Sequence, residues 1–330
     1  MTQTIQNQLH ELASNCDNRT SIFDVRITSH TDGHLTLGGR VLEQAQVDEL
    51  QRLFSDLKVD TASIHILHRD NLPHMTVATN LTGLYEKPTF GMPLSSELCF
   101  GTDVEILDEE GRWVFTRQRD GYLGWAYRPY LAEVQKNETH LVIAPSIEVR
   151  TAPDITGKVL TRLVSGTGVT VNETQGEWSL VAANETGWLP SSALRAVKDI
   201  PQPLDGKRKI IIEDAARMIG VPYLWGGTSG NGIDCSGFAR LLHHWVGVQI
   251  PRDADMQCEA ARPVEGPFEI GDLFFFGEGD SHRHVTHVGI SLGGWTMIHS
   301  SRGHNGVYID DIQENKSLKE IYMSAGSFLR

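Results

Sequence analysis

The sequence has few cysteines, no excess of basic residues and no long apolar run, and each absence excludes a class of protein. Its four cysteines among 330 residues are too few and too scattered for a disulfide framework, and no Cys-x-x-Cys pair indicates a structural zinc site. Twenty-nine lysines and arginines against 42 acidic residues give a net charge of −13, which argues against nucleic-acid binding. No stretch approaches the roughly 20 apolar residues of a membrane-spanning helix.

The N-terminal residues do not form a basic start followed by an apolar core, so no secretory signal is expected. Together with the scattered cysteines, this predicts a cytoplasmic protein. The length suggests about two or three domains. The oligomeric state is left open.

The middle of the chain contains an internal repeat at an offset of 65 residues. Gly101-Thr-Asp-Val-Glu-Ile recurs as Gly166-Thr-Gly-Val-Thr-Val, and Gly111-Arg-Trp recurs as Gly176-Glu-Trp. Short alternating runs broken by glycine, aspartate and asparagine surround these anchors. The pattern is typical of small antiparallel β-barrels of about 60 residues each.

Residues 1–80, ahead of the repeat, predict a separate α+β unit with no assigned role. Val47, Leu50, Phe54 and Leu57 recur at helical spacing and predict a helix of about 14 residues with one apolar stripe. Short β-like runs flank this helix at Phe23–Thr28, Leu35–Arg40, Ser63–Leu67 and Met75–Ala78.

The turn-rich stretch 199–206 predicts a linker to a last domain over residues 207–330. This domain is expected to begin with a helix from Lys207 to about Ile219. A second helix is predicted after Asp234, which is a natural N-cap and places Cys235 in the first turn. The β-like stretches that follow are Asp272–Phe276, His287–Leu292 and Thr296–Ser300, so a helix followed by a single sheet predicts an α+β domain.

Cys235 is the candidate nucleophile because the unpaired amides and the positive dipole end of a helix favour a thiolate. A nucleophile needs a base, and the base needs an orienting group. His287 begins one alternating run and His299 ends another, so two adjacent strands can present both imidazoles to the helix. The remaining thiols are interpreted as structural, namely Cys16, Cys99 and Cys258.

The other histidines allow a different interpretation. His282, His284 and His287 form His-x-His-x-x-His, a spacing compatible with metal ligands. No cysteine or carboxylate lies at a matching spacing, so we favour loop positions for the first two and expect no metal site. His243 and His244 are expected on the helix after Cys235 as partly exposed residues.

Three runs in the last domain carry a family resemblance. Asp234-Cys-Ser-Gly-Phe238, His287-Val-Gly-Ile290 and the strand-ending His299 resemble the NlpC-type papain-like cysteine peptidases of bacterial peptidoglycan. The run Gly187-Trp-Leu-Pro-Ser-Ser-Ala-Leu194 is similar to the end of bacterial SH3-like domains. Together they resemble the subgroup that cleaves γ-D-glutamyl–diamino acid bonds in free murein peptides.

The resemblance implies roles for individual residues. Cys235 would attack the acyl carbon, His287 would be the general base and His299 would orient it, with no cofactor. Asp253 matches the acid that binds the free α-amine of the substrate, and an acidic residue and a tyrosine of the first SH3-like domain complete that pocket. The best matches for these two are Glu97 and Tyr122. Two neighbours of the nucleophile are further candidate substrate contacts, Asp234 and Ser236.

The expected architecture is therefore α+β. A papain-like catalytic domain over 207–330 follows SH3-like barrels over 81–136 and 137–198 and the α+β unit over 1–80. The expected function is hydrolysis of the γ-D-glutamyl–diamino acid amide of short murein peptides with a free N-terminal L-Ala, in cell-wall peptide recycling. A peptide-binding or wall-binding SH3-like protein and an acyltransferase or amidase on the same scaffold remain alternatives. The preferred diamino acid is left open.

Overall fold

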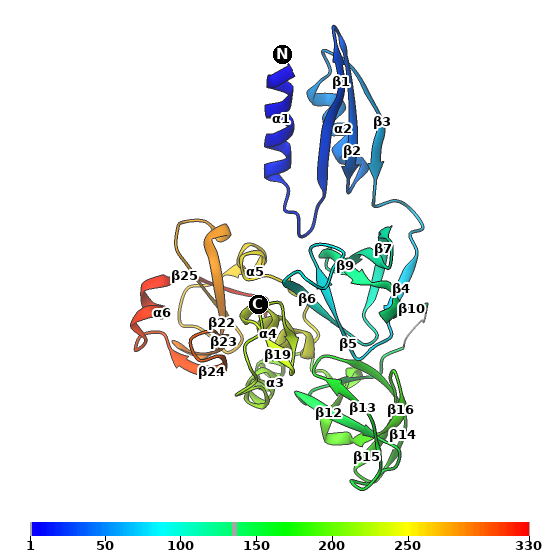
Figure 1. Ribbon diagram of the computed structural model, residues 1–330. Helices are drawn as coiled ribbons and strands as arrows, with labels where there is room; N and C mark the ends of the chain where they lie inside the picture. Colours follow the sequence, from blue (N-terminus) through cyan, green and yellow to red (C-terminus); the bar gives the residue numbers. More distant parts are fainter. Residues whose placement is uncertain (1, 134–136, 330) are drawn as a thin grey trace. The chain divides into compact units, whose positions relative to one another are not determined.

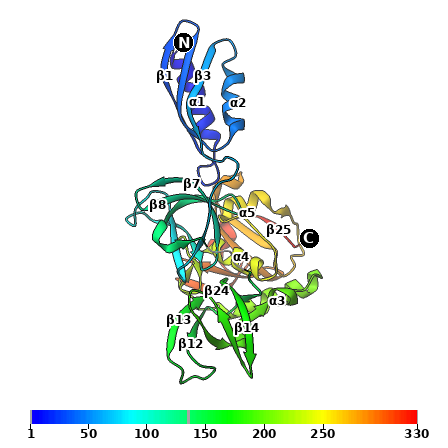
Figure 2. The ribbon, with the colours of Figure 1, turned by 90° about the vertical axis from the view of Figure 1, so that its right-hand side faces the viewer.

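The computed structural model (Figures 1 and 2) describes residues 2–133 and 137–329. The chain divides into two compact units. One unit comprises Met1–Met75 and Asp103–Arg128, and the other comprises Thr76–Thr102 and Pro129–Arg330. Helices and strands are mixed in both units, as expected. Among the described residues, no helix is both long and apolar enough to cross a membrane. The expected domain boundary at residue 136 lies outside the described residues.

The first unit contains a three-stranded sheet and two helices. Its elements are α1 (Thr2–Asn15), β1 (Phe23–Thr31), β2 (His34–Val41), α2 (Gln44–Leu53) and β3 (Lys58–Ile66). Strands β1 and β2 are antiparallel and β2 and β3 are parallel, so α2 forms the crossover that a parallel pair requires. The helices contribute Ile5, Leu9, Val47 and Leu50 to a core shared with the sheet. The four β-like runs predicted for residues 1–80 are confirmed, the first three as β1, β2 and β3 and the fourth as β4 (His74–Val77).

Helix α2 is shorter than its apolar spacing predicts. It has 10 residues and ends before Phe54, whose amide donates to the Leu50 carbonyl at 3.1 Å. Leu57 follows in a turn, where its amide donates to the Phe54 carbonyl at 2.9 Å. Leu57 still packs against the same core. The turn therefore keeps its apolar residues on the side of the chain that faces the core. In the sequence, their spacing looks the same as that of one more turn of helix.

The internal repeat corresponds to two antiparallel meanders with matching turns. The first is β7 (Asp103–Glu110), β8 (Trp113–Gln118) and β9 (Leu123–Tyr127); the second is β14 (Gly168–Gln175), β15 (Trp178–Ala182) and β16 (Thr186–Pro190). Gly111 and Gly176 occupy equivalent turns with φ of 61° and 58°, and Gly101 and Gly166 both have φ of 83°. Only glycine adopts this left-handed conformation without a steric cost. The geometry of the turns thus explains why glycines occupy equivalent positions in the two copies of the repeat.

The second unit contains the barrel to which the second meander belongs. Its seven strands lie in the order β13-β12-β16-β15-β14-β11-β17 around a core that includes Val149, Leu163 and Val181. The strands and short helices not yet introduced are β5 (Leu81–Tyr85), β6 (Leu94–Cys99), η1 (Arg128–Tyr130), β10 (Leu131–Ala132), β11 (His140–Val142), β12 (Ser146–Arg150), β13 (Val159–Val164), η2 (Ser191–Ala193), β17 (Leu194–Ala196) and η3 (Val197–Asp199). Strands β5 and β6 form an antiparallel hairpin.

A six-stranded antiparallel sheet dominates the C-terminal part of the second unit, in the order β20-β25-β21-β22-β23-β24. Its elements are α3 (Leu204–Arg217), β18 (Thr228–Ser229), β19 (Gly232–Ile233), α4 (Cys235–Trp245), α5 (Ala254–Ala260), β20 (Arg262–Pro263), β21 (Leu273–Gly277), η4 (His282–His284), β22 (Val285–Gly293), β23 (Thr296–Ser301), β24 (Gly306–Asp311), α6 (Lys316–Ile321) and β25 (Tyr322–Ser327). Helix α3 begins inside the predicted linker, directly after Pro203. Proline is tolerated at a helix start because the N–H that it lacks would not have formed a hydrogen bond within the helix. The helices and strands predicted here are otherwise confirmed.

Strand β21 is buried on both faces of this sheet. Leu273 and Phe275 share a core with Phe238 of α4, whereas Phe274 and Phe276 lie in a separate cluster. Because successive side chains of a strand point to opposite faces, an unbroken apolar run is expected only where both faces are covered. Helix α4 therefore packs against one face of the sheet, and this packing places its first turn beside β22.

The second barrel is fixed to this domain within the second unit. The indole Nε1 of Trp245, at the end of α4, donates to the Val142 carbonyl of β11 at 3.1 Å. Leu141 and Ile143, on either side of Val142, belong to the core that surrounds α4. The nucleophile helix therefore rests on a barrel strand as well as on its own sheet.

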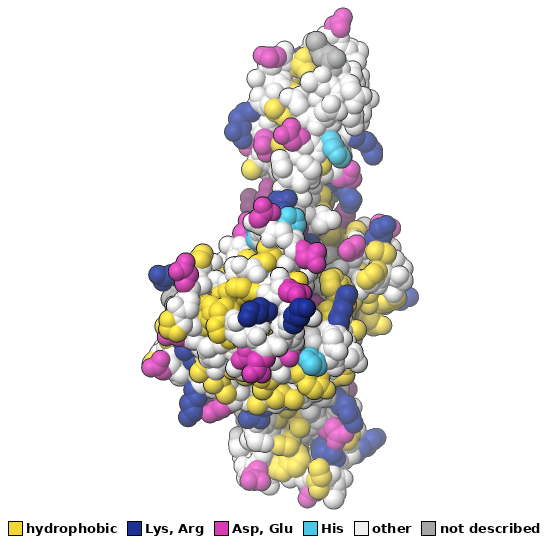
Figure 3. Space-filling model, turned by 90° about the vertical axis from the view of Figure 1, so that its left-hand side faces the viewer, with side chains coloured by type: hydrophobic (Ala, Val, Ile, Leu, Met, Phe, Trp, Pro, Cys, Tyr) yellow, Lys and Arg dark blue, Asp and Glu magenta, His cyan; other side chains and the backbone are white. Residues whose placement is uncertain are grey.

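Charged side chains are spread over the surface. On the face drawn in Figure 3, acidic and basic side chains are intermingled, as a net charge of −13 from 29 basic and 42 acidic residues allows. The expectation that the protein does not bind nucleic acid stays a prediction.

The expected partial exposure of His243 is wrong. This side chain is fully buried in α4, with Nδ1 2.8 Å from the Ala239 carbonyl and Nε2 without a partner among the described residues. Burial lowers the pKa of His243 from 6.5 to about 4, opposed by the bond to Ala239. A neutral imidazole can fill an apolar position, which helical spacing alone does not reveal.

The buried imidazole predicts acid sensitivity. Between pH 6.5 and about 4 the unfolded chain binds a proton at His243 that the folded chain does not, so the free energy of unfolding falls as the pH drops. His243→Leu should make this fall shallower in denaturant titrations, whereas His284→Leu, at an exposed site, should not. An unchanged pH dependence in His243→Leu would contradict the assignment.

Candidate active site

Helix α4 begins at Cys235 because Asp234 caps it. The Asp234 Oδ1 accepts the Gly237 amide at 2.7 Å, which satisfies one of the amides that a helix start leaves unpaired. Its Oδ2 accepts the Gly226 amide at 2.9 Å. The cap therefore fixes both the first turn of the helix and the preceding loop, and the thiol lies buried at the point where they meet.

A buried arginine lies behind the cap. Arg252 is 1% exposed. It donates two hydrogen bonds to the Asp234 carboxylate, from Nη2 to Oδ2 at 2.7 Å and from Nη1 to Oδ1 at 3.1 Å. Its Nη1 also donates to the Ser236 hydroxyl at 3.0 Å, and its Nε donates to the Ser96 hydroxyl of β6 at 3.1 Å. Both oxygens of Asp234 and the hydroxyl of Ser236 are thus engaged within the protein. Their predicted contacts with substrate stay predictions.

The thiol of Cys235 is held in its protonated form. Burial, and next the charge of Asp234, raise its pKa from 9.0 to about 12, while the backbone amides of Val288 and Ser236 and the charge of Arg252 oppose the rise. The amides and dipole of the helix start favour a thiolate, as expected from the sequence, but burial of the thiol outweighs them. The nucleophile therefore needs a base that removes its proton during the reaction.

Three neighbouring strands supply a chain of hydrogen bonds. His287 of β22 lies with Nε2 2.6 Å from Nδ1 of His299 on β23. The Nε2 of His299 lies 2.8 Å from Oδ2 of Asp310 on β24. The amide of Val288, which follows His287, reaches the sulfur of Cys235 and so places the thiol beside the start of this chain. The structure brings the three predicted catalytic residues together and adds Asp310.

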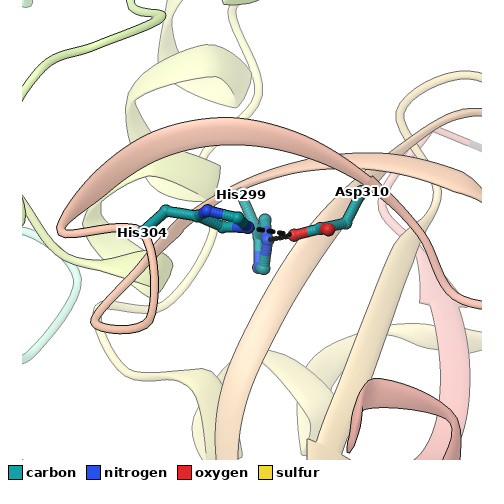
Figure 4. A group of neighbouring side chains, drawn as sticks. All are labelled: His299, His304 and Asp310. Atoms are coloured by element: carbon teal, nitrogen blue, oxygen red, sulfur yellow. Dashed lines mark hydrogen bonds and ion pairs between the residues drawn. The ribbon is translucent and has the colours of Figure 1, made fainter. Parts of the chain in front are cut away.

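The carboxylate of Asp310 is held from three directions. Figure 4 shows His299 and His304 both directed at Asp310; His304 Nε2 lies 2.9 Å from Oδ2. Asn315 Nδ2 donates to Oδ1 at 3.3 Å. Partial burial acts to raise the pKa of Asp310, but the bonds from His299, Asn315 and His304 outweigh it and lower the pKa. Asp310 is therefore an anion and an acceptor.

An anionic Asp310 decides where the protons of both imidazoles lie. It accepts from Nε2–H of His299, so Nδ1 of His299 carries a lone pair and accepts from Nε2–H of His287. Nδ1 of His287 is then left with a lone pair that can take the proton of the thiol. Burial lowers the pKa of His287 to about 3 and also lowers that of His299, so both rings are neutral at rest. The arrangement is that of a nucleophile with an oriented base.

Part of this cluster offers several metal-ligating side chains to one point. Among the described residues, only His299, His304 and Asp310 bring three ligand atoms within 4.8 Å of one another. Each of these atoms is already in a hydrogen bond. The spacing His-x-His-x-x-His does not produce such a group, because His282 and His284 lie on η4 and His282 faces Glu259 at 3.7 Å.

The predicted substrate residues lie at different depths. Glu97 of β6 is buried, and its Oε2 accepts the Thr228 amide at 2.9 Å and the Ser229 hydroxyl at 3.0 Å. Burial raises the pKa of Glu97, against the two bonds and the charge of Arg252. Asp253 precedes α5 and lies 3.8 Å from Arg252, with a partly exposed side chain. Tyr122 is buried in the first unit, and its contact with substrate stays a prediction.

No sequence pattern predicted a role for Arg252 or Asp310. Arg252 stands in the sequence beside Asp253, so adjacency to a candidate residue was the available signal. Asp310 lies on β24, at one edge of the sheet. In the sequence it is only one carboxylate within an alternating run, which does not indicate its histidine partner. The other thiols, Cys16, Cys99 and Cys258, take part in no disulfide among the described residues, and none of the three begins a described helix.

A thiol at a helix start, packed on an antiparallel sheet that supplies an oriented histidine, defines a papain-like cysteine peptidase. Residues 220–326 match the NlpC/P60 family, residues 145–195 a bacterial SH3 domain, and residues 84–126 the bacterial dipeptidyl-peptidase Sh3 domain. The chain belongs to the NlpC/P60 family and is a cysteine peptidase.

Individual relatives agree with this assignment. The chain is 34% identical over 153 residues to a probable endopeptidase of Corynebacterium glutamicum, covering 42% of this chain and 71% of the relative. It is 28% identical over 255 residues to a gamma-D-glutamyl-L-lysine dipeptidyl-peptidase of Bacillus cereus, covering 72% and 75%. The crystal structure of an NlpC/P60 family protein from Bacillus cereus has the same fold, with a TM-score of 0.68 at 24% identity over 78% of this chain and all of that chain.

Removal of the nucleophile tests the assignment of the thiol. Cys235→Ala should lower peptide hydrolysis by about 10³-fold or more, because base and nucleophile act as a unit. Cys16→Ala, Cys99→Ala and Cys258→Ala should each retain most activity. The measurement is the rate of product release at equal enzyme concentration. Substantial turnover by Cys235→Ala would refute the assignment.

Replacement of Asp310 tests the proton arrangement. In Asp310→Asn an amide N–H can face Nε2 of His299, which moves protons along the chain and leaves His287 without its free lone pair toward the thiol. We expect kcat to fall about 10⁴-fold with little change in KM, as for a wrong tautomer.

The matched control is Asp311→Asn, the same change at the next residue of β24, where Asp311 bonds to Thr296 and not to a histidine. It should retain wild-type kcat. Equal losses in the two variants would indicate damage to β24 and not a change of tautomer.

Proposed function

We propose that the chain hydrolyses the amide between the γ-carboxyl group of D-glutamate and a diamino acid in short murein peptides with a free N-terminal L-Ala. Relatives from Bacillus cereus and Bacillus subtilis that are named gamma-D-glutamyl-L-lysine dipeptidyl-peptidase support this substrate class. So does the match of residues 84–126 to the Sh3 domain of a bacterial dipeptidyl-peptidase.

The observation that carries the proposal is the buried carboxylate of Glu97. Both of its hydrogen bonds to described residues fall on Oε2 and come from β18, the strand just ahead of the nucleophile loop. Its Oε1 makes no such bond, so it can accept from an ammonium group. A buried acceptor gains a charge-assisted bond from a free α-amine, and an acylated amine cannot supply the charge. We assign Asp253 to the same task, and a substrate contact of Tyr122 stays a prediction from the sequence.

The reaction uses the residues of the site in sequence. As the sulfur of Cys235 attacks the acyl carbon, its proton passes to Nδ1 of His287, which the bond to His299 keeps in orientation. The backbone amide of Cys235 stabilises the resulting oxyanion. The C–N bond then breaks as His287 returns the proton to the leaving amine. Water, deprotonated by His287, hydrolyses the thioester and releases the dipeptide and the free thiol.

An acyltransferase would share every step up to the thioester and differ only in what attacks it. Mass spectrometry of the products therefore separates the two functions: hydrolysis releases L-Ala-D-Glu as the free acid, and transfer attaches it to another amine. Peptide recycling is the biological role that we propose for the hydrolase. A cytoplasmic location remains a prediction from the sequence.

The closing test compares L-Ala-γ-D-Glu-L-Lys with its N-acetylated form. We expect kcat/KM to be at least about 10²-fold higher for the free amine, because acetylation leaves buried acceptors without a charged donor. Equal cleavage of the two peptides would rule out the specificity.

Glu97→Gln keeps the shape and removes the charge, so it should lower kcat/KM for the free peptide and leave the acetylated peptide unaffected. Glu177→Gln, on an exposed turn of the second barrel, is the matched control and should behave as wild type. A loss on both peptides in Glu97→Gln would point to a structural role for Glu97 alone.

A further inference from the structure

Arg302 is an exposed arginine in the loop between β23 and β24, where two aromatic rings hold its guanidinium group. The guanidinium carbon lies 5.0 Å from the ring centroid of Trp225 and 5.6 Å from that of Tyr223. Cation–π contacts of this kind favour one orientation of a side chain that is otherwise free to move. Trp225 is itself 58% exposed, although tryptophan side chains are on average highly buried in folded proteins.

The loop that carries Arg302 lies against the approach to the nucleophile. The amide of Tyr223 donates to the Asn305 carbonyl at 3.3 Å, and Tyr223 forms a β-bridge with Ile233. The Ser300 hydroxyl donates to the Ile233 carbonyl at 2.7 Å, two residues before Cys235. In line with this geometry, burial and the neighbouring Cys235 and Asp234 raise the pKa of Tyr223, while Arg302 opposes the rise.

No carboxylate among the described residues forms an ion pair with Arg302, although acidic residues surround the nucleophile. The other arginine of the site, Arg252, is already paired with both oxygens of Asp234. Arg302 also donates toward the Tyr223 hydroxyl, but its planar group of five N–H donors has no carboxylate partner among the described residues. A guanidinium fork matches a carboxylate, which can accept two parallel bonds from it.

We propose that Arg302, braced by Trp225 and Tyr223, forms a subsite that binds an α-carboxylate of the substrate next to the scissile amide. The inference rests on the proposed function, in which that amide joins D-glutamate to a diamino acid. Both residues then carry an α-carboxylate within a few bonds of the reacting carbon. One lies on the acyl side and one on the leaving side, and either offers the chemistry that Arg302 recognises. The subsite selects substrates by this charge.

The test uses three peptides and compares enzyme variants. The peptides are L-Ala-γ-D-Glu-L-Lys, its analogue with the D-glutamate α-carboxylate as an amide, and its analogue with the lysine carboxylate as an amide. For wild type, one of the two amidated peptides should lose about tenfold in kcat/KM, mostly through KM. In Arg302→Gln the unmodified peptide should fall by the same factor, and that amidation should cause no further loss. The peptide that shows this coupling identifies the side of the bond.

Arg302→Lys keeps the charge but not the fork, so it should recover part of the loss. Arg262→Gln is the matched control, since Arg262 is an exposed arginine of β20 at the opposite edge of the sheet from β24. It should keep the wild-type preference. Equal discrimination against each amidated peptide in Arg302→Gln and wild type would overturn the subsite.

A measurement without turnover separates this inference from the proposed function. Calorimetric binding of the unmodified tripeptide to Cys235→Ala should weaken about tenfold when Arg302→Gln is added. Failure of wild type to bind or cleave the tripeptide would refute the proposed function and the subsite with it. Cleavage by wild type with identical binding in both variants would refute the subsite alone.

Discussion

The ion pair between Asp234 and Arg252 is the interaction on which the site depends. One carboxylate caps the nucleophile helix, anchors the preceding loop at Gly226 and binds an arginine that also reaches Ser96 on β6. Because the pair is almost fully buried, loss of either partner would leave an uncompensated charge, which costs several kcal/mol in proteins generally. The position of the thiol, the loop before it and strand β6 are thus fixed by one set of bonds. Glu97 follows Ser96 directly, so the same bonds set the position of the proposed amine acceptor.

The positions of the catalytic histidines depend on the register of three antiparallel strands. Neighbouring strands place His287, His299 and Asp310 side by side, and the hydrogen bonds between them fix each ring by its neighbour. Burial keeps both rings neutral, so the orientation of the protons, and not the charge, prepares the base. A site built on strands is held more rigidly than one built on loops, which suits a proton transfer that tolerates little displacement.

The sequence predicted the parts of the fold whose information is local. Asp234 as a cap, Cys235 in the first turn and the alternating strands around His287 and His299 all follow from neighbouring residues. Arg252 and Asp310 were missed because their partners lie elsewhere in the chain and no spacing records such pairing. His243 was misjudged because helical spacing does not distinguish a neutral buried imidazole from an exposed one. The helix that contains Leu50 was predicted too long because Leu57, which lies in a turn, also faces the core and so continues the apolar spacing of the helix. Each error arises where tertiary packing decides a question that local pattern leaves open.

The buried and protonated state of Cys235 also bears on oxidative damage. Peroxides react with thiolates, and a thiol whose pKa is raised to about 12 contains very little thiolate at neutral pH. Its sulfur is also shielded from solvent by the first turn of α4 and by β22. The resting enzyme therefore keeps its sulfur out of the sulfenic acid pathway that inactivates exposed, low-pKa cysteines. The sulfur becomes nucleophilic only when His287 takes its proton during attack on a bound acyl group, so the presence of substrate controls when the sulfur reacts.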